Sequence, residues 1–240
     1  MKFWKKVLAS VTAGVLCVGG VGLSGVESVL ESMGTVLSAS AYVPYSYDGI
    51  TYEGLYYNVT DTGEIEIAGC YEYVRKVNIP IEIDGKSVTS IGEYAFYNCT
   101  SLTEITIPDS VTSIGEYAFY KCTSLTAITI PDGVTSIRKG TFSGCTSLTE
   151  ITIPDSVTDI EGRQYDGFSY YGAFSGCTSL TEITIPDSVT SIGECVFYGC
   201  TGLTEIIIPD SVTSIGWGAF SGCTSLTEIT IPDSVTSIGE

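Results

Sequence analysis

Cysteine side chains are the first groups in this sequence whose spacing could support chemistry. Six of them recur at intervals of 23, 23, 32, 23 and 23 residues. They are Cys99, Cys122, Cys145, Cys177, Cys200 and Cys223. Zinc sites use close pairs such as C-x-x-C, and the sequence contains none. We therefore interpret this cysteine column as buried thiols that act as small apolar side chains, with disulfides as the alternative in an oxidising compartment. Cys195 lies outside the column and is the predicted reactive thiol.

Carboxylates form two further columns with the same period. The glutamates, predicted on an exposed strand face, are Glu104, Glu150, Glu182, Glu205 and Glu228. The aspartates, predicted in the adjoining turn, are Asp109, Asp132, Asp155, Asp187, Asp210 and Asp233. Calcium could bridge such columns, but the sequence lacks the dense Gly-Asp loops of calcium-binding solenoids. We predict solvated carboxylates, with neither a metal nor a cofactor.

Catalysis has little support in the sequence. There is no histidine, which removes the commonest general base and every histidine-dependent triad. Asp61-Thr62-Gly63 spells the aspartic-protease triplet, but such a protease needs two carboxylates that share a proton, and only one copy is present. The triplet is better interpreted as a hairpin turn between two alternating segments. We predict that the chain is not an enzyme.

The charge balance restricts the partners. Asp and Glu number 28 against 10 Lys and Arg, which gives a net charge of -18. A surface of that sign repels phosphate backbones and anionic lipid headgroups, so we expect neither a nucleic-acid partner nor polybasic membrane docking.

The first 41 residues are predicted to be a signal peptide. Lys2, Lys5 and Lys6 precede an uncharged apolar run over residues 7–26, and Ala39-Ser40-Ala41 offers the small-x-small pattern that signal peptidase cleaves. An uncleaved membrane anchor is the alternative, because the run is about as long as a bilayer requires. We expect a secreted or cell-surface protein with no membrane span after removal of the signal.

Residues 101–115 recur letter for letter at 179–193 and 225–239, which indicates an internal repeat. Within a unit, Leu102, Ile105 and Ile107 have the spacing of an inward-facing strand, and Pro108 ends it. A second alternating segment follows at 111–114, and residues 118–122 then turn towards the next leucine. One unit cannot bury its apolar side alone, so the units must stack about 4.8 Å apart.

The unit L-T-E-I-T-I-P-D-S-V-T-S-I-G-x-x-A-F-x-x-C-T-S resembles the repeat of the BspA-like leucine-rich-repeat family of bacterial surface and secreted proteins. The resemblance covers about residues 79–240. It implies a mainly β repeat solenoid, a right-handed coil of 23-residue units with short strands and helical or 3₁₀ turns. It also implies an extracellular surface used for adhesion or protein binding, without catalytic residues.

The predicted organisation has three parts. Residues 1–41 are the signal peptide, 42–86 a β-rich N-terminal cap, and 87–240 the solenoid. The solenoid has six leucine-initiated units, a nine-residue insertion at about 162–171, and a last unit that stops halfway. We expect the sequence to be a fragment, because repeat arrays need a cap at each end, with a partner that covers the open end as the alternative.

The insertion is the predicted site of specificity, with the glutamate column as a second candidate. It carries Arg163, Tyr165, Phe168, Tyr170 and Tyr171, a combination of aromatic area and positive charge that is enriched at binding hot spots. The alternative is an idle surface loop. Three functions remain open: a binding module for a host or neighbouring surface protein, a structural spacer, and the repeat portion of a longer surface protein or enzyme.

Overall fold

The computed structural model describes residues 50–52, 54–71, 73–165 and 169–239, with backbone only at 50–52, 164–165 and 169–170. The signal peptide predicted at residues 1–41 lies outside this range.

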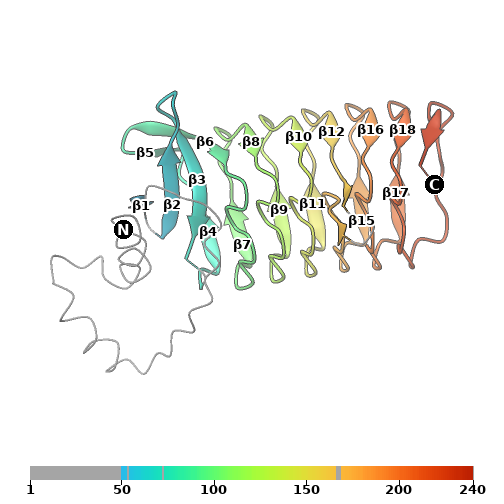
Figure 1. Ribbon diagram of the computed structural model, residues 1–240, viewed down its shortest axis with the longest axis horizontal. Coiled ribbons are helices and arrows are strands. Elements are labelled where there is room, and N and C mark those ends of the chain that lie inside the picture. The colour runs from blue at the N-terminus through green and yellow to red at the C-terminus, as the bar shows by residue number, and fades with distance from the viewer. Residues whose placement is uncertain (1–49, 53, 72, 166–168, 240) are drawn as a thin grey trace, which may run out of the picture. The chain divides into compact units, whose positions relative to one another are not determined.

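Antiparallel strands precede the coils (Figure 1). Strand β1 (Ile50–Tyr52) pairs with β2 (Leu55–Val59), and β2 pairs with β3 (Ile65–Cys70). The Asp61-Thr62-Gly63 triplet lies in the turn between β2 and β3, where the N–H of Gly63 donates to the Thr60 carbonyl. Its interpretation as a hairpin turn is therefore confirmed.

The same sheet continues into the repeats. Strand β3 pairs in parallel with β6 (Lys86–Ile91), and β6 also pairs in parallel with β8 (Ser113–Ile114) and antiparallel with β5 (Glu82–Ile83). The hairpin strands therefore share backbone hydrogen bonds with the first coil.

Two short strands recur in each coil up to β18, and the last described coil contributes one, which makes a β-solenoid of about seven turns (Figure 1). The first strands of successive coils are β4 (Lys76–Asn78), β7 (Glu104–Thr106), β9 (Ala127–Thr129), β11 (Glu150–Thr152), β15 (Glu182–Thr184) and β17 (Glu205–Ile207). After β8, the second strands are β10 (Ser136–Ile137), β12 (Asp159–Ile160), β16 (Ser191–Ile192), β18 (Ser214–Ile215) and β19 (Ser237–Ile238). The second strands pair in parallel, so that Ile160 lies opposite Ile137 and Ile192. Equivalent residues therefore stack coil upon coil, as the repeat predicted.

The core consists of continuous columns of like side chains. The largest is a ladder of phenylalanines whose neighbouring ring centroids are 5.1–5.6 Å apart and whose planes differ by 2–8°. Its members are Phe96, Phe119, Phe142, Phe174, Phe197 and Phe220. All but Phe220, which is half-buried, are fully buried. Because each ring packs between the coils on either side, the core forms only when coils stack.

The turns that follow the second strands differ from the sequence prediction. We predicted helical or 3₁₀ turns, but the described residues contain no helix. Tyr117 and Lys121 have positive φ, at 54° and 55°, whereas both kinds of helix need negative φ at every residue. Between them, the N–H of Phe119 donates to the Thr141 carbonyl of the next coil at 2.8 Å. These segments are therefore hydrogen-bonded turns that add to the bonding between coils.

Candidate binding surfaces

The acidic strand face comprises the exposed residues of the first strands. Glu150, Glu182 and Glu205 point outward because each first strand alternates exposed, buried and exposed positions. Glu182 lies directly opposite Glu205 across the parallel pairing of β15 and β17. Among the described residues, no cation pairs with these three carboxylates. The face therefore presents uncompensated negative charge in a fixed arrangement.

The glutamate column is interrupted at both ends. Glu104 lies opposite Lys76 and forms an ion pair with it, a partner that the sequence analysis missed because Lys76 precedes the first complete unit. Ala127 occupies the glutamate position in β9. Glu228 is exposed but lies in a segment that forms no strand. The continuous part of the column is thus limited to Glu150, Glu182 and Glu205.

A groove opens on this face beside β17. It has a volume of about 420 Å³ and lies between β17 and residues 227–230 of the next coil, with Glu205 and Glu228 among its lining residues. Ile207 also lines it and is 64% exposed, at a position where β7, β9, β11 and β15 carry threonine. An exposed isoleucine flanked by carboxylates is suited to a side chain that combines an apolar stem with a positive charge, as Lys and Arg do.

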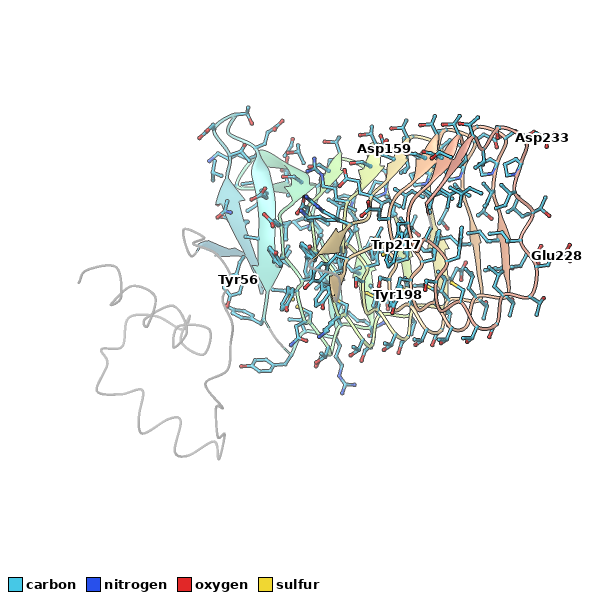
Figure 2. All side chains as sticks on the ribbon, turned by 45° about the vertical axis from the view of Figure 1, so that its right-hand side comes forward. Tyr56, Asp159, Tyr198, Trp217, Glu228 and Asp233 are labelled. Atoms are coloured by element: carbon cyan, nitrogen blue, oxygen red, sulfur yellow. The ribbon has the colours of Figure 1, made fainter. Side chains whose placement is uncertain are left out.

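The arrangement of the described carboxylates and thiols does not support a metal site. Among the described residues, no three His, Cys, Asp or Glu side chains come close enough to hold one ion. Figure 2 shows Glu228 and Asp233 projecting from different parts of the last coil. The glutamate and aspartate columns therefore do not converge on a common point there.

The insertion is a β-hairpin that leaves the solenoid after β12. Strand β13 (Gln164–Tyr165) pairs antiparallel with β14 (Ser169–Tyr170), and the N–H of Tyr171 donates to the Arg163 carbonyl at the base. Arg163 is exposed. The side chains of Tyr165 and Tyr170 and the whole of Phe168 lie outside the described part, so their predicted contact role stays a prediction.

Two glycines fix the base of the hairpin. A Cβ at Gly162 would lie 1.9 Å from the carbonyl oxygen of Glu194, and one at Gly172 would lie 1.8 Å from that of Cys195. Glu194 and Cys195 are consecutive residues of the next coil, so Gly162 and Gly172 occupy consecutive positions of their own coil. The hairpin is therefore residues 163–171, inserted into an otherwise complete 23-residue unit.

Tyr171 packs into a tyrosine cluster that the sequence analysis did not identify. The cluster consists of Tyr94, Tyr97, Tyr117, Tyr120 and Tyr171, all half-buried. Tyr94 stacks on Tyr117 at 5.0 Å, and Tyr97 stacks on Tyr120 at 5.1 Å. Tyr171 meets Tyr117 edge-on at 5.4 Å, which anchors one strand end of the hairpin to the solenoid. The sequence does contain a sign of this cluster. Two successive units carry tyrosine at the same two positions, and the third unit carries the small residues Gly140 and Ser143 there.

The acidic strand face and the insertion hairpin arise from different parts of a coil. The acidic strand face lies on the first strand of each coil, whereas the hairpin leaves after the second strand. On the coils that follow the hairpin, Tyr198 and Trp217 are half-buried. The hairpin and the tyrosine cluster that Tyr171 joins are therefore distinct from the acidic strand face.

The cysteine column is buried, as predicted. The thiols of Cys122, Cys145 and Cys177 donate to the carbonyls of Phe96, Phe119 and Phe142, each in the preceding coil, at 3.1–3.2 Å. Burial raises the pKa of Cys145 to about 12, and it raises that of Cys200 equally. These thiols stay protonated near neutral pH and are inert.

The prediction that Cys195 is a reactive thiol is wrong. Its side chain is buried, and burial raises its pKa to about 11, with Glu194 adding to the increase. Reactive cysteines have a lowered pKa and access to solvent, and Cys195 has neither.

Comparison with known proteins places these features in context. Residues 67–170 and 168–240 match the model of the BspA type leucine rich repeat region, with six copies. None of the curated proteins compared with the chain matches it. Within the described residues, no helix has the length and hydropathy needed to span a membrane.

Three solved structures are similar to the chain. A leucine-rich repeat protein from Bacteroides ovatus is 38% identical, with a TM-score of 0.71 over 80% of this chain and 49% of that one. The leucine rich repeat protein of T. pallidum is 34% identical, with a TM-score of 0.68 over 79% and 85%. A leucine rich cell surface protein from Faecalibacterium prausnitzii is 36% identical, with a TM-score of 0.67 over 79% and 50%. The chain therefore spans about half the length of two of these proteins.

Proposed function

The chain belongs to the BspA-type leucine-rich repeat family, and we propose that it is a non-catalytic module that binds basic protein surfaces outside the cell or at its surface. The similar protein from Faecalibacterium prausnitzii is described as a cell surface protein, and the predicted signal peptide agrees with that location. The absence of histidine from the sequence supports a binding role over a catalytic one.

The observation that carries the proposal is the acidic strand face with its groove at Ile207. Glu150, Glu182 and Glu205 are held on adjacent strands of a rigid stack, so binding requires little ordering of the module itself. Complementary charge increases the association rate and selects partners of opposite sign. Ile207 adds an apolar contact for the stem of a Lys or Arg side chain.

The test is capture of extracellular and cell-surface proteins by the immobilised chain, followed by affinity measurements on each retained protein. We expect at least one retained protein with a basic surface. Replacing Glu150, Glu182 and Glu205 by Gln should weaken its binding about tenfold or more, and Ile207→Thr should weaken it severalfold. Binding by the unaltered chain should fall as salt is added, because exposed charges are screened.

The matched control replaces Asp155, Asp187 and Asp210 by Asn. These exposed aspartates belong to the same three coils, so this variant loses the same charge from the turn instead of the strand face. Ile207→Thr is itself conservative, because it introduces the residue that other coils carry. Equal binding by both triple variants would contradict a role for the strand face, and failure to retain any protein would favour a structural spacer.

The hairpin is tested separately as a second binding surface. A chain lacking residues 163–171, with Gly162 joined to Gly172, restores a 23-residue unit and leaves the core columns unchanged. We expect it to fold, with a melting temperature within a few degrees of the intact chain, because loops are removed at small entropic cost. Its affinity for each retained protein, measured beside that of the intact chain, should be lower. Unchanged affinity for every one would show that the hairpin is an idle loop.

A further inference from the structure

Two cysteines from different parts of the fold are in contact at the start of the solenoid. Cys70 ends β3 in the N-terminal sheet, and Cys99 lies in the turn of the first coil. Their sulfur atoms are 3.6 Å apart, and both thiols are free. Cys99 is buried and Cys70 is half-buried, so the pair lies at the edge of the core with one member reachable by small reagents.

This pair differs from the rest of the cysteine column. From Cys122 onward, each column thiol donates to a phenylalanine carbonyl of the preceding coil, which directs its sulfur towards the backbone. Cys99 is the first member, and Phe96, the first ring of the ladder, belongs to its own coil. The thiol of Cys99 instead contacts the thiol of Cys70, and either sulfur can be the donor. Among the described residues, no other two sulfur atoms form such a contact.

We propose that Cys70 and Cys99 are an oxidation site, at which a small-molecule or protein disulfide converts the two thiols into a disulfide that joins the N-terminal sheet to the first coil. The thiolate of Cys70 attacks one sulfur of the oxidant RS–SR, which gives a mixed disulfide and releases RS⁻. The thiolate of Cys99 then attacks the Cys70 sulfur and releases the second RS⁻. Both cysteines are oxidised, RS–SR is reduced to two RSH, and the two thiol protons pass to the leaving groups.

The geometry suits this step. A disulfide needs its sulfurs at about 2.05 Å, so they must approach by about 1.5 Å, a movement that side-chain rotation can supply. The bond would close a loop between residues 29 positions apart and so restrict the unfolded chain. The hydrogen bond with Cys99 and burial both raise the pKa of Cys70. Oxidation should therefore be slow at neutral pH and accelerate about tenfold per pH unit as the thiolate fraction rises.

The experiment uses the full chain with Cys17→Ser, treated with glutathione disulfide at mildly alkaline pH. In that background the tryptic peptide 7–75 contains Cys70 alone, and the peptide 87–121 contains Cys99 alone. We expect mass spectrometry to find these two peptides joined, with a loss of two titratable thiols. The melting temperature of the oxidised chain should exceed that of the reduced chain by about 10 °C.

The controls compare oxidised and reduced forms of the same variant, so a change in basal stability does not affect the readout. Cys70→Ala and Cys99→Ala should each abolish both the joined peptides and the increase in melting temperature. Cys195→Ala, which removes another buried thiol, should leave both intact. The proposal is overturned if the thiol count of the folded chain is unchanged by oxidant, if other cysteines pair, or if oxidation does not raise the melting temperature.

Discussion

Replacing Phe142 by Ala is expected to lower the free energy of unfolding by about 3–5 kcal/mol. The Phe142 ring is fully buried, between Phe119 at 5.4 Å and Phe174 at 5.6 Å. Its loss leaves a cavity that neighbouring coils cannot fill, because backbone hydrogen bonds from Phe142 to Ala173 and from Phe119 to Thr141 fix their spacing. Urea denaturation followed by circular dichroism measures the change.

Phe220→Ala provides the matched control. Phe220 has the same position in its unit, but within the described part of the chain Phe197 is its one neighbour in the ladder, and it is half-buried. The same substitution there should cost about half as much or less. Equal losses of stability in the two variants would show that the phenylalanine ladder does not act as a continuous column.

Raising the pH from 9 to 11 is expected to remove about 2–3 kcal/mol of stability for each of Cys145 and Cys200. Burial raises the pKa of both thiols from 9.0 to about 12, so the folded chain favours the protonated form. Their contribution is therefore fully present below pH 9 and is lost as pH rises from 9 towards 12. The pKa values of Cys122 and Cys177 are raised by burial as well, which adds to the loss.

Denaturation midpoints at a series of pH values, under reducing conditions, measure this effect. The double variant Cys145→Ala, Cys200→Ala should be less stable at pH 7, because it loses two packed side chains, yet its stability should fall less steeply above pH 9. Burial also raises the pKa of Tyr117, so tyrosinate absorbance should be recorded to separate its titration from that of the thiols. An identical slope in the double variant and the unaltered chain would show that the column thiols do not control alkaline stability.

The solenoid itself could be predicted from the sequence because its period determines its packing. Phe119 and Phe142 are one unit apart, and stacking the units buries both rings beside their equivalents. The turn conformation could not be predicted, because tyrosine and lysine favour negative φ and only the contacts between coils hold Tyr117 and Lys121 at positive φ.

The candidate surfaces were predictable to a lesser degree. The exposure of Glu182 and Glu205 follows from strand alternation, which the sequence displays. The ion pair of Glu104 with Lys76 depends on pairing with a strand outside the repeat pattern. The packing of Tyr171 against Tyr117 depends on how the hairpin folds back over an earlier coil, for which a linear sequence carries no periodic signal.

The letter-for-letter recurrence of residues 101–115 at 179–193 and 225–239 has a consequence for how such a chain can change in evolution. Because equivalent residues meet wherever two coils stack, a whole unit can be gained or lost and the neighbouring coils still make the same contacts. A gain or loss of part of a unit would place unlike residues opposite one another at the junctions of that unit, unless the extra residues leave the coil as a hairpin, as they do at β13 and β14. Molecular length, and with it the number of carboxylates displayed, is thus adjustable in steps of 23 residues.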